Sequence, residues 1–224
     1  MYSGKTEDGT EYSFGTSGLL YRSNKLMYDR QTFTLWGNLT GEPVVGKMAT
    51  SDQRLRVLPM TLTTWSEWRK MHPQTKVLFV DDKFGAQWNY RYEPGFADRA
   101  RAGVNFPVWQ KSKVLENKAE VYALRVNNIP KAYPIKQLVA KRIVNDKIGE
   151  TPIVLVVDPE SEAVRAYMRG AHSFSADLKD ETGKKWNVTE EALVSGTEKL
   201  ERIPGHLSLW FAWYGFFPHT EIYK

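Results

Sequence analysis

One pattern of tryptophan, proline and threonine occurs twice in this chain with identical spacing, and it constrains the fold more than any other feature. The first copy comprises Pro59, Trp65, Trp68, Pro73 and Thr75, and the second comprises Pro204, Trp210, Trp213, Pro218 and Thr220. An upstream block also agrees, with Thr32, Trp36 and Gly46 matching Thr182, Trp186 and Gly196. Six of the eight tryptophans fall within these blocks. The simplest interpretation is two copies of one supersecondary unit, packed with pseudo-two-fold symmetry.

Short apolar segments separated by turn residues predict a β-rich fold. β-rich pieces are expected at 11–15, 18–28 and 32–36, and strands at 55–59, 76–80, 121–126, 129–133, 142–147, 153–157 and 163–168. Asn127 and Asn128 are typical of a two-residue hairpin turn. We therefore expect an α+β fold of mainly antiparallel strands with a few short helices, arranged as two pseudo-symmetric halves.

The halves have predicted boundaries. Residues 1–80 form the first repeat half, residues 121–224 form the second, and the aromatic-rich residues 81–120 connect them. Within this connector, residues 81–104 mix glycine, proline, charged and aromatic residues without periodicity. A segment of this kind is either a link between the repeats or a functional lid.

Two helices carry the repeated tryptophans. Thr64 and Glu67 form a capping-box pattern, after which Trp65 and Trp68 share one face of an amphipathic helix and are expected in the core. The second helix, opened by Ser208, is apolar nearly all round. Such a helix is either buried within the chain or covered by a partner, so residues 207–217 could form an oligomer contact.

Two further short helices are expected. Pro134 suits the first turn of a helix that runs to about Ala140. Thr189 suits the N-cap of a helix that ends before Gly196.

Composition excludes several classes of site. The chain has no cysteine, so disulfides, zinc–thiolate sites, iron–sulfur clusters and thiol nucleophiles are excluded for it. The net charge of +5 is spread among 26 acidic residues without a dense basic run, so no nucleic-acid partner is expected. No apolar run reaches the length of a membrane span, and no signal-peptide core is present.

Several motifs imitate catalytic or binding signatures without their chemistry. The segment from Gly41 to Lys47 resembles a phosphate-binding loop, but Met48 stands where a magnesium-binding hydroxyl is required. Ser17 lies between glycines, but the context of a nucleophile elbow is missing. The four histidines, His72, His172, His206 and His219, show no metal-ligand spacing, so neither a metal site nor a cofactor is expected.

The candidate site residues lie mostly on one polar stretch. Arginine and asparagine beside aromatic rings can hold an anionic or sugar-like ligand, and a structural ion-pair network is the alternative interpretation. His206 is a further candidate because it precedes the apolar helix, although it could equally be a buried structural histidine. The candidate set is Tyr21, Arg22, Asn24, Asp29, Arg30 and His206.

The chain also resembles a known family. The residues that carry the resemblance are the run from Ser17 to Arg30 followed by Thr32 and Trp36, then Thr64, Trp65, Trp68, His72, Pro73 and Thr75, then Lys131 to Pro134, Val144 to Asp146 with Gly149, and finally His206 with Trp210 to Trp213. They are similar to the domain of unknown function 3179 family over nearly the whole chain. The resemblance implies no activity, but it suggests an extracytoplasmic protein.

The same resemblance implies an upstream part that carries a Cys-x-x-Cys segment. The chain therefore resembles a family member without this part, and its first half is expected to be incomplete at the N-terminus. Metal or redox chemistry that depends on those cysteines would be restricted to longer relatives.

Two hypotheses about function follow. In the first, the chain is a ligand-binding or interaction module for a small molecule or a protein partner, with a pocket formed by the Tyr21–Arg30 stretch and residues 81–104. In the second, it is an enzyme with a polar site between the halves that uses Asp29, Arg30 and His206. A solvent-accessible cleft lined by Tyr21, Arg22 and aromatic residues of the 81–104 segment would favour the first hypothesis, and a flat surface there would exclude it. Separation of Asp29, Arg30 and His206 would weigh against the second.

Overall fold

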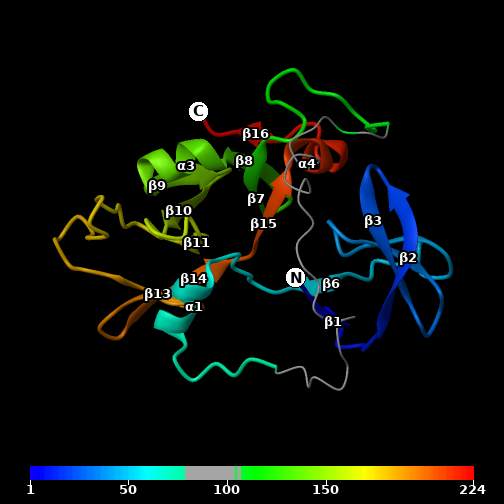
Figure 1. The fold of residues 1–224 in the computed structure, drawn as a ribbon, viewed down its shortest axis with the longest axis horizontal. Helices are drawn as coiled ribbons and strands as arrows, with labels where there is room; N and C mark the ends of the chain where they lie inside the picture. The colour runs from blue at the N-terminus through cyan, green and yellow to red at the C-terminus, as the bar shows by residue number, and fades with distance from the viewer. Residues whose placement is uncertain (79–103, 105–106) are drawn as a thin grey trace, which may run out of the picture.

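The computed structural model describes residues 1–78, 104 and 107–224, and most of its regular structure is antiparallel strand (Figure 1). The first part of the chain contains β1 (Tyr2–Thr6), β2 (Phe14–Tyr21), β3 (Asn24–Asp29), β4 (Leu35–Gly37), β5 (Pro43–Val45), β6 (Leu55–Val57) and α1 (Trp65–Met71). The later part contains β7 (Glu120–Val126), β8 (Ile129–Pro134), α3 (Ile135–Lys141), β9 (Ile143–Ile148), β10 (Thr151–Val157), β11 (Val164–Met168), β12 (Asn187–Val188), β13 (Ala192–Ser195), β14 (Glu198–Ile203), β15 (Gly205–Leu209), α4 (Trp210–Phe216) and β16 (Glu221–Ile222). The expected α+β class, with mainly antiparallel strands and short helices, is confirmed, whereas the arrangement as two pseudo-symmetric halves stays a prediction.

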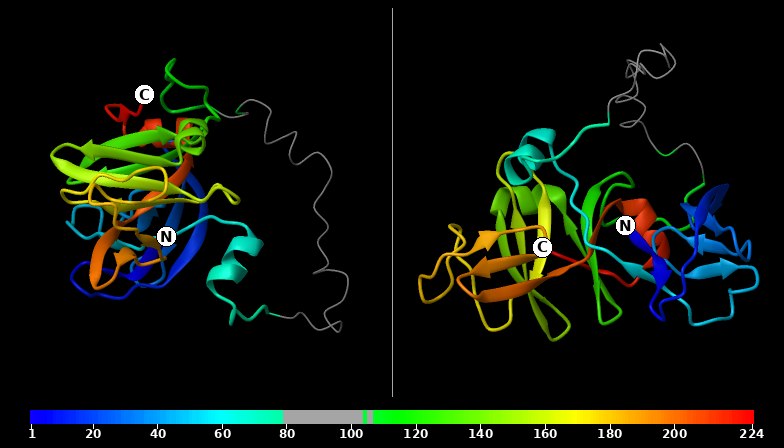
Figure 2. Two further views of the ribbon diagram at one scale, coloured as in Figure 1. Left: turned by 90° about the vertical axis from the view of Figure 1, so that its left-hand side faces the viewer. Right: turned by 90° about the horizontal axis from the view of Figure 1, so that it is seen from below.

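The described strands form four sheets. A two-stranded sheet has the order β1-β6, and a four-stranded sheet has the order β2-β3-β4-β5. The later strands form a six-stranded sheet, β12-β13-β14-β11-β10-β9, and a four-stranded sheet, β15-β7-β8-β16. Among the described pairs only β8 and β16 run parallel. Figure 2 shows β7, β15 and α4 between the strands of the first half and the six-stranded sheet.

Two tight hairpins follow from local sequence. Asn127 and Asn128 have φ of 49° and 64° and join β7 to β8, as their residue types predict. Arg22 and Ser23 have φ of 48° and 64° and join β2 to β3. The β-rich stretch expected over 18–28 is thus divided between β2 and β3, and the chain reverses at Arg22 without the glycine or asparagine that usually marks this turn.

Two other expected elements were placed incorrectly. The helix expected after Thr189 is β13, whose residues pair with β14, and the Thr189 hydroxyl donates to the Ala192 carbonyl at 2.8 Å in the connecting turn. The run Ala192-Leu193-Val194 is compatible with a buried strand as well as with a helix. Pairing with β14 makes it a strand in this structure. The strand expected at 76–80 is not formed at residues 76–78, and its last two residues lie outside the described part.

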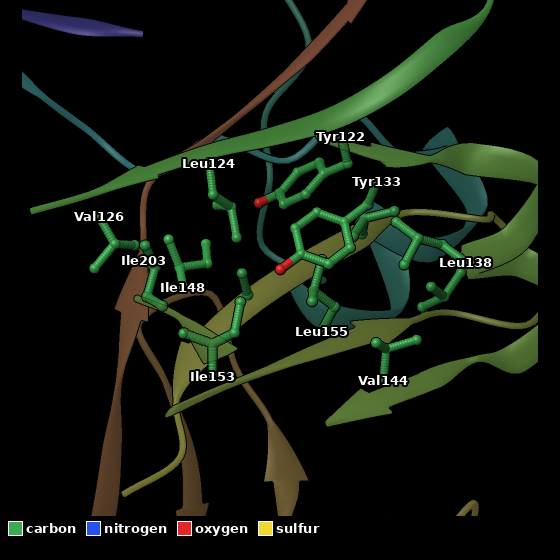
Figure 3. Close-up of a cluster of buried hydrophobic side chains, with 13 residues drawn as sticks. Tyr122, Leu124, Val126, Tyr133, Leu138, Val144, Ile148, Ile153, Leu155 and Ile203 are labelled. Carbon is green, nitrogen blue, oxygen red and sulfur yellow. The ribbon is translucent and has the colours of Figure 1, made fainter. Parts of the chain in front are cut away.

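The main core lies between the six-stranded sheet and the β7–β8 hairpin. Figure 3 shows this cluster, in which Leu124, Tyr133, Leu138, Ile153 and Leu155 are fully buried. A second cluster packs α4 against β7 and β8 and includes Val121, Ala123, Ala132, Trp210 and Trp213. Burial of these side chains supplies most of the favourable free energy of folding.

The apolar helix α4 is covered by its own chain. Its buried residues are Trp210, Phe211, Ala212, Trp213, Gly215 and Phe216. Intramolecular packing therefore accounts for its apolar character, and a role for residues 207–217 in an oligomer stays a prediction. Among the described helices none has the length and apolar character needed to cross a bilayer.

The helix α1 is oriented opposite to the sequence prediction. Trp65 is 50% exposed, whereas Glu67 is only 8% exposed. Thr64 accepts a hydrogen bond from the Glu67 amide at 3.3 Å, as the capping-box pattern predicts. The Glu67 carboxylate, however, pairs with Arg165 at 2.9 Å and accepts from Ser161 at 2.6 Å, and these contacts turn it toward the protein interior.

A buried ion network extends from this contact. Arg165 is 2% exposed and pairs with Glu190 at 2.7 Å, and Arg202 binds the same carboxylate at 2.6 Å. Thr61 also donates to Glu190, at 2.9 Å. Burial alone would raise the pKa of Glu190, but the hydrogen bonds from Arg165, Arg202 and Thr61 outweigh burial and lower it to about 2. The network joins residues 61–67 to the six-stranded sheet.

The repeated tryptophans make matching contacts. Trp36 donates to Asp29 at 2.9 Å and packs edge-on against Phe14 at 5.7 Å. Trp186 donates to Asp180 at 2.9 Å and packs edge-on against Phe174 at 5.7 Å. Trp68 and Trp213 donate to Thr75 and Thr220 at 2.8 and 3.1 Å. The local contacts thus follow the repeated spacing, while an origin from two copies of one unit stays a prediction.

We predict that Trp36→Phe lowers the free energy of unfolding by about 1–3 kcal/mol, because a buried carboxylate loses a hydrogen-bond donor. Trp186→Phe should act in the same direction. Urea denaturation measures both, with Trp109→Phe as control because this side chain is 61% exposed. An equal loss in the control would show that the effect does not come from the aspartate contacts.

We also predict that Glu190→Gln destabilises the fold by about 3 kcal/mol at neutral pH, since two buried guanidinium groups lose a shared charge partner. In the unaltered protein this stabilisation is present above pH 4.5 and is lost as the pH falls toward 2, because the folded-state pKa is the lower one. Urea denaturation across this pH range tests both statements. Glu191→Gln, at the exposed neighbouring position, is the matched control, and an equal effect there would contradict the prediction.

Candidate functional site

Two adjoining pockets lie where the first half meets α4 and β7, and together we call them the Arg125 groove. The larger has a volume of about 320 Å³, and the smaller has a volume of about 120 Å³. Thr40, Arg125 and Phe217 line both pockets. The larger is completed by Tyr21, Arg22, Glu42, Pro43, Val44 and Phe216, and the smaller by Tyr2, Leu39, Val57, Pro204, His206 and Trp213.

The β2–β3 turn places Arg22 over aromatic rings. Its guanidinium carbon lies 5.2 Å from the centre of the Tyr21 ring and 5.9 Å from that of Phe216, within the range of cation–π attraction. A Cβ at Gly215 would lie 3.0 Å from the Arg22 carbonyl oxygen, so the turn approaches α4 closely at a glycine. The Arg22 Nε atom is buried and has no hydrogen-bond partner within the described part of the chain.

Arg125 supplies a second positive charge to the groove. It lies on β7, and its guanidinium carbon is 5.7 Å from the centre of the Phe217 ring. Its Nη1 is 3.5 Å from Glu42 Oε1, and the same oxygen is 3.6 Å from Arg54 Nε. Both distances exceed those of a close charge-assisted hydrogen bond, which are 2.7–2.9 Å. Glu42 therefore neutralises Arg125 only in part.

His206 lines the smaller pocket from β15. Its ring centre is 6.5 Å from that of Tyr2 and 6.2 Å from that of Trp213. Burial lowers the pKa of His206 to about 4, and nearby positive charges, including Arg125, act in the same direction. At neutral pH the imidazole is therefore uncharged and can both donate and accept a hydrogen bond.

The structure brings some of the predicted site residues together. Tyr21 and Arg22 line the larger pocket, and His206 lines the smaller one. The side chain of Asn24 instead accepts a hydrogen bond from the Lys25 amide at 2.7 Å. Arg30 is exposed, and its Nη1 is 3.2 Å from the Tyr28 hydroxyl.

Asp29 serves the core. It is fully buried and accepts hydrogen bonds from Trp36 at 2.9 Å and from the Thr32 hydroxyl at 2.8 Å. Burial would raise its pKa, but these hydrogen bonds outweigh burial and lower the pKa below the usual range. Asp29 and Arg30 line neither pocket of the groove.

Sequence reasoning missed Arg125, Glu42 and Phe217. A weak signal existed for Arg125, since it interrupts an otherwise apolar strand from Val121 to Val126. Nothing in the sequence places Glu42 beside it, because the two residues are brought together by packing between the halves. Among the described residues no three histidine, aspartate or glutamate side chains converge as metal ligands.

We predict that stability falls as the pH falls from 6.5 toward 4, by at most roughly 3 kcal/mol, because His206 is held neutral in the folded state and is protonated first in the unfolded chain. His206→Gln should flatten this dependence. Urea denaturation at several pH values measures it, with the exposed His219→Gln as control. A slope in His206→Gln equal to that of the unaltered protein would contradict the assignment.

Comparisons with known proteins give a family and no activity. The family model described as "Protein of unknown function (DUF3179)" matches residues 2–220. The search of curated proteins returned no match. The search of solved structures also returned no match. The family match spans nearly the whole chain and confirms the resemblance seen in the sequence, so the chain belongs to the DUF3179 family of proteins of unknown function.

Proposed function

We propose that the chain is a ligand-binding module whose Arg125 groove takes a small molecule with a carboxylate, sulfate or phosphate group. The observation that carries the proposal is the buried Nε of Arg22, which lacks a hydrogen-bond partner in the described part of the chain while its guanidinium lines an open pocket. A buried donor without a partner costs free energy, and an anionic ligand would supply the missing acceptor. Guanidinium groups also match the planar geometry of oxyanions.

The charges in the groove support an anionic ligand. Arg22 and Arg125 line the larger pocket, and among the described residues Glu42 is its single acidic lining residue. Because the Glu42–Arg125 distance of 3.5 Å is long, Arg125 can turn toward a ligand at small cost. The groove therefore keeps a net positive charge.

The aromatic residues support a ligand with a flat or apolar part. Tyr21, Phe216 and Phe217 form one wall of the larger pocket. Aromatic walls with a few convergent polar groups are typical of small-molecule sites. A pocket of about 320 Å³ lies at the small end of the range for such sites, which favours a metabolite-sized ligand.

The enzyme hypothesis receives less support from the geometry. It requires Asp29, Arg30 and His206 at one site, but the Asp29 carboxylate is buried against Trp36 and Thr32. Of the residues named for the binding hypothesis, Tyr21 and Arg22 line the groove, whereas residues 81–103 lie outside the described part of the chain. We further propose that the groove lies between two copies of one ancestral unit, a relation supported by the matching tryptophan contacts.

Sulfate is a suitable probe because its charge does not change between pH 4 and 8. We expect Arg22→Gln and Arg125→Gln each to weaken sulfate binding by about tenfold or more, since each removes a charge-assisted hydrogen bond. Isothermal titration calorimetry measures the affinity. Arg30→Gln is the matched control, because Arg30 is an exposed arginine on the same hairpin but outside the groove.

The pH gives an independent readout. An anion beside His206 favours the imidazolium form, so sulfate should bind more tightly as the pH falls from 7 toward 4, and His206→Gln should remove this increase. Equal affinity in all three arginine variants would overturn the proposal. So would a complete lack of binding of sulfate and of the dicarboxylate succinate.

A further inference from the structure

A separate pocket of about 280 Å³ is lined by Gly205 and Leu207 of β15 and by Glu120 and Tyr122 of the neighbouring β7, and we call it the β15 pocket. It shares no lining residue with the Arg125 groove. We propose that it binds an extended peptide with alternating apolar side chains and at least one lysine or arginine, which adds to β15 as a further strand. This proposal does not depend on the function proposed for the groove.

The first argument is the free edge of β15. This strand is the outermost in its sheet and pairs with β7 on one side, from Gly205 opposite Leu124 to Leu209 opposite Glu120. No described strand pairs with its other side, and no described backbone group hydrogen-bonds there. Unpaired edge groups are a template for another strand, and peptide recognition by strand addition uses them.

The second argument is the apolar character of the pocket. Leu207 on β15 is 40% exposed, and Met60 and Leu62 on the segment leading into α1 are 39% and 66% exposed. The three side chains line one pocket together with Ile135 and Val164. This segment passes close to β15 in both Figure 1 and Figure 2. Exposed apolar side chains gathered around one hollow are typical of an interaction site.

The walls of the pocket are held in place. Arg202, a member of the buried ion network, binds Thr61 at 2.5 Å and the Met60 carbonyl at 3.4 Å. On the other side β15 is fixed by its ladder with β7. Both walls are thus preformed, which reduces the entropy lost on binding.

The third argument is the charge at the pocket. Glu120 and Glu162 are lining residues, and neither forms an ion pair within the described part of the chain. The chain as a whole has a net charge of +5, so this acidic site is a local feature. Complementary charge favours a peptide with a basic residue and selects against acidic peptides.

The length of the edge sets the length of the peptide. β15 has five residues, and a strand rises about 3.3 Å per residue. A peptide of five or six residues therefore covers the edge. Its alternate side chains point to one face, so every second residue reaches the apolar pocket.

The probe is an N-terminally fluorescein-labelled peptide, Lys-Leu-Thr-Leu-Lys-amide, added to the whole chain. Fluorescence anisotropy measures its affinity, and amide hydrogen exchange measures protection of β15. We expect binding with slower exchange at β15. Two further peptides are N-methylated at the third and at the fourth residue, and one of them should bind at least tenfold more weakly, because only alternate amides of an added strand face β15.

Variants of the chain test the side-chain contacts. Leu207→Ser should weaken binding about tenfold, and Ile129→Ser is its control because Ile129 has a similar exposure of 37% but lies outside the pocket. Glu120→Gln with Glu162→Gln should weaken binding severalfold and reduce its salt dependence. Urea denaturation of each variant separates lost binding from lost folding.

Three outcomes would overturn the proposal. The first is equal binding of the unmodified peptide and both N-methylated peptides. The second is peptide binding that leaves exchange at β15 unchanged. The third is self-association, seen by sedimentation, that protects the β15 amides without peptide, since the edge would then belong to a second copy of the chain.

Discussion

The structure depends on the way in which the guanidinium of Arg165 is neutralised. A buried charge is tolerated only when it is paired and hydrogen-bonded, and Arg165 meets this condition through Glu67 at 2.9 Å and Glu190 at 2.7 Å. Glu67 belongs to α1, whereas Arg165 and Glu190 belong to the region of the six-stranded sheet. The pairing therefore fixes the end of the first half on the second half. It also holds the segment that forms one wall of the β15 pocket.

This pairing explains the main error of the sequence analysis. The spacing of Trp65 and Trp68 correctly predicted a helix and its capping by Thr64, because both properties are local. Which face of α1 is buried depends on Arg165, which lies 98 residues after Glu67 in the chain. Because Arg165 pairs with Glu67, the face that carries Glu67 is turned inward instead of the face that carries the tryptophans. In α4 the equivalent position of Glu67 is Ala212, so no charge competes and both tryptophans are buried. The two helices share a pattern, but their partners give them different orientations.

The same division between local and tertiary information applies to the candidate site. The sequence identified Tyr21, Arg22 and His206, which line the groove, because arginine and histidine beside aromatic residues are unusual locally. It grouped Asp29 with them because strand neighbours were treated as one surface. The carboxylate of Asp29 instead accepts a hydrogen bond from the indole of Trp36. Asp180 accepts the same hydrogen bond from Trp186. The contact between Arg125 and Glu42 could not be predicted, since the two residues meet only through tertiary packing.

The Arg125 groove lies where the β2–β3 turn meets α4, and the β15 pocket lies where the β10–β11 turn meets the segment leading into α1. The β2–β3 turn carries Arg22 to Phe216 of α4, and the β10–β11 turn carries Ser161 to Glu67 of α1. The contact between Arg22 and Phe216 leaves the Arg22 Nε without a hydrogen-bond partner in the described part of the chain. The carboxylate of Glu67 is used by Ser161 and Arg165, while Glu162 lines the β15 pocket. The Arg125 groove is therefore positive and the β15 pocket acidic. We propose that ligands of opposite charge are thereby directed to separate sites, so that neither site competes for the ligand of the other.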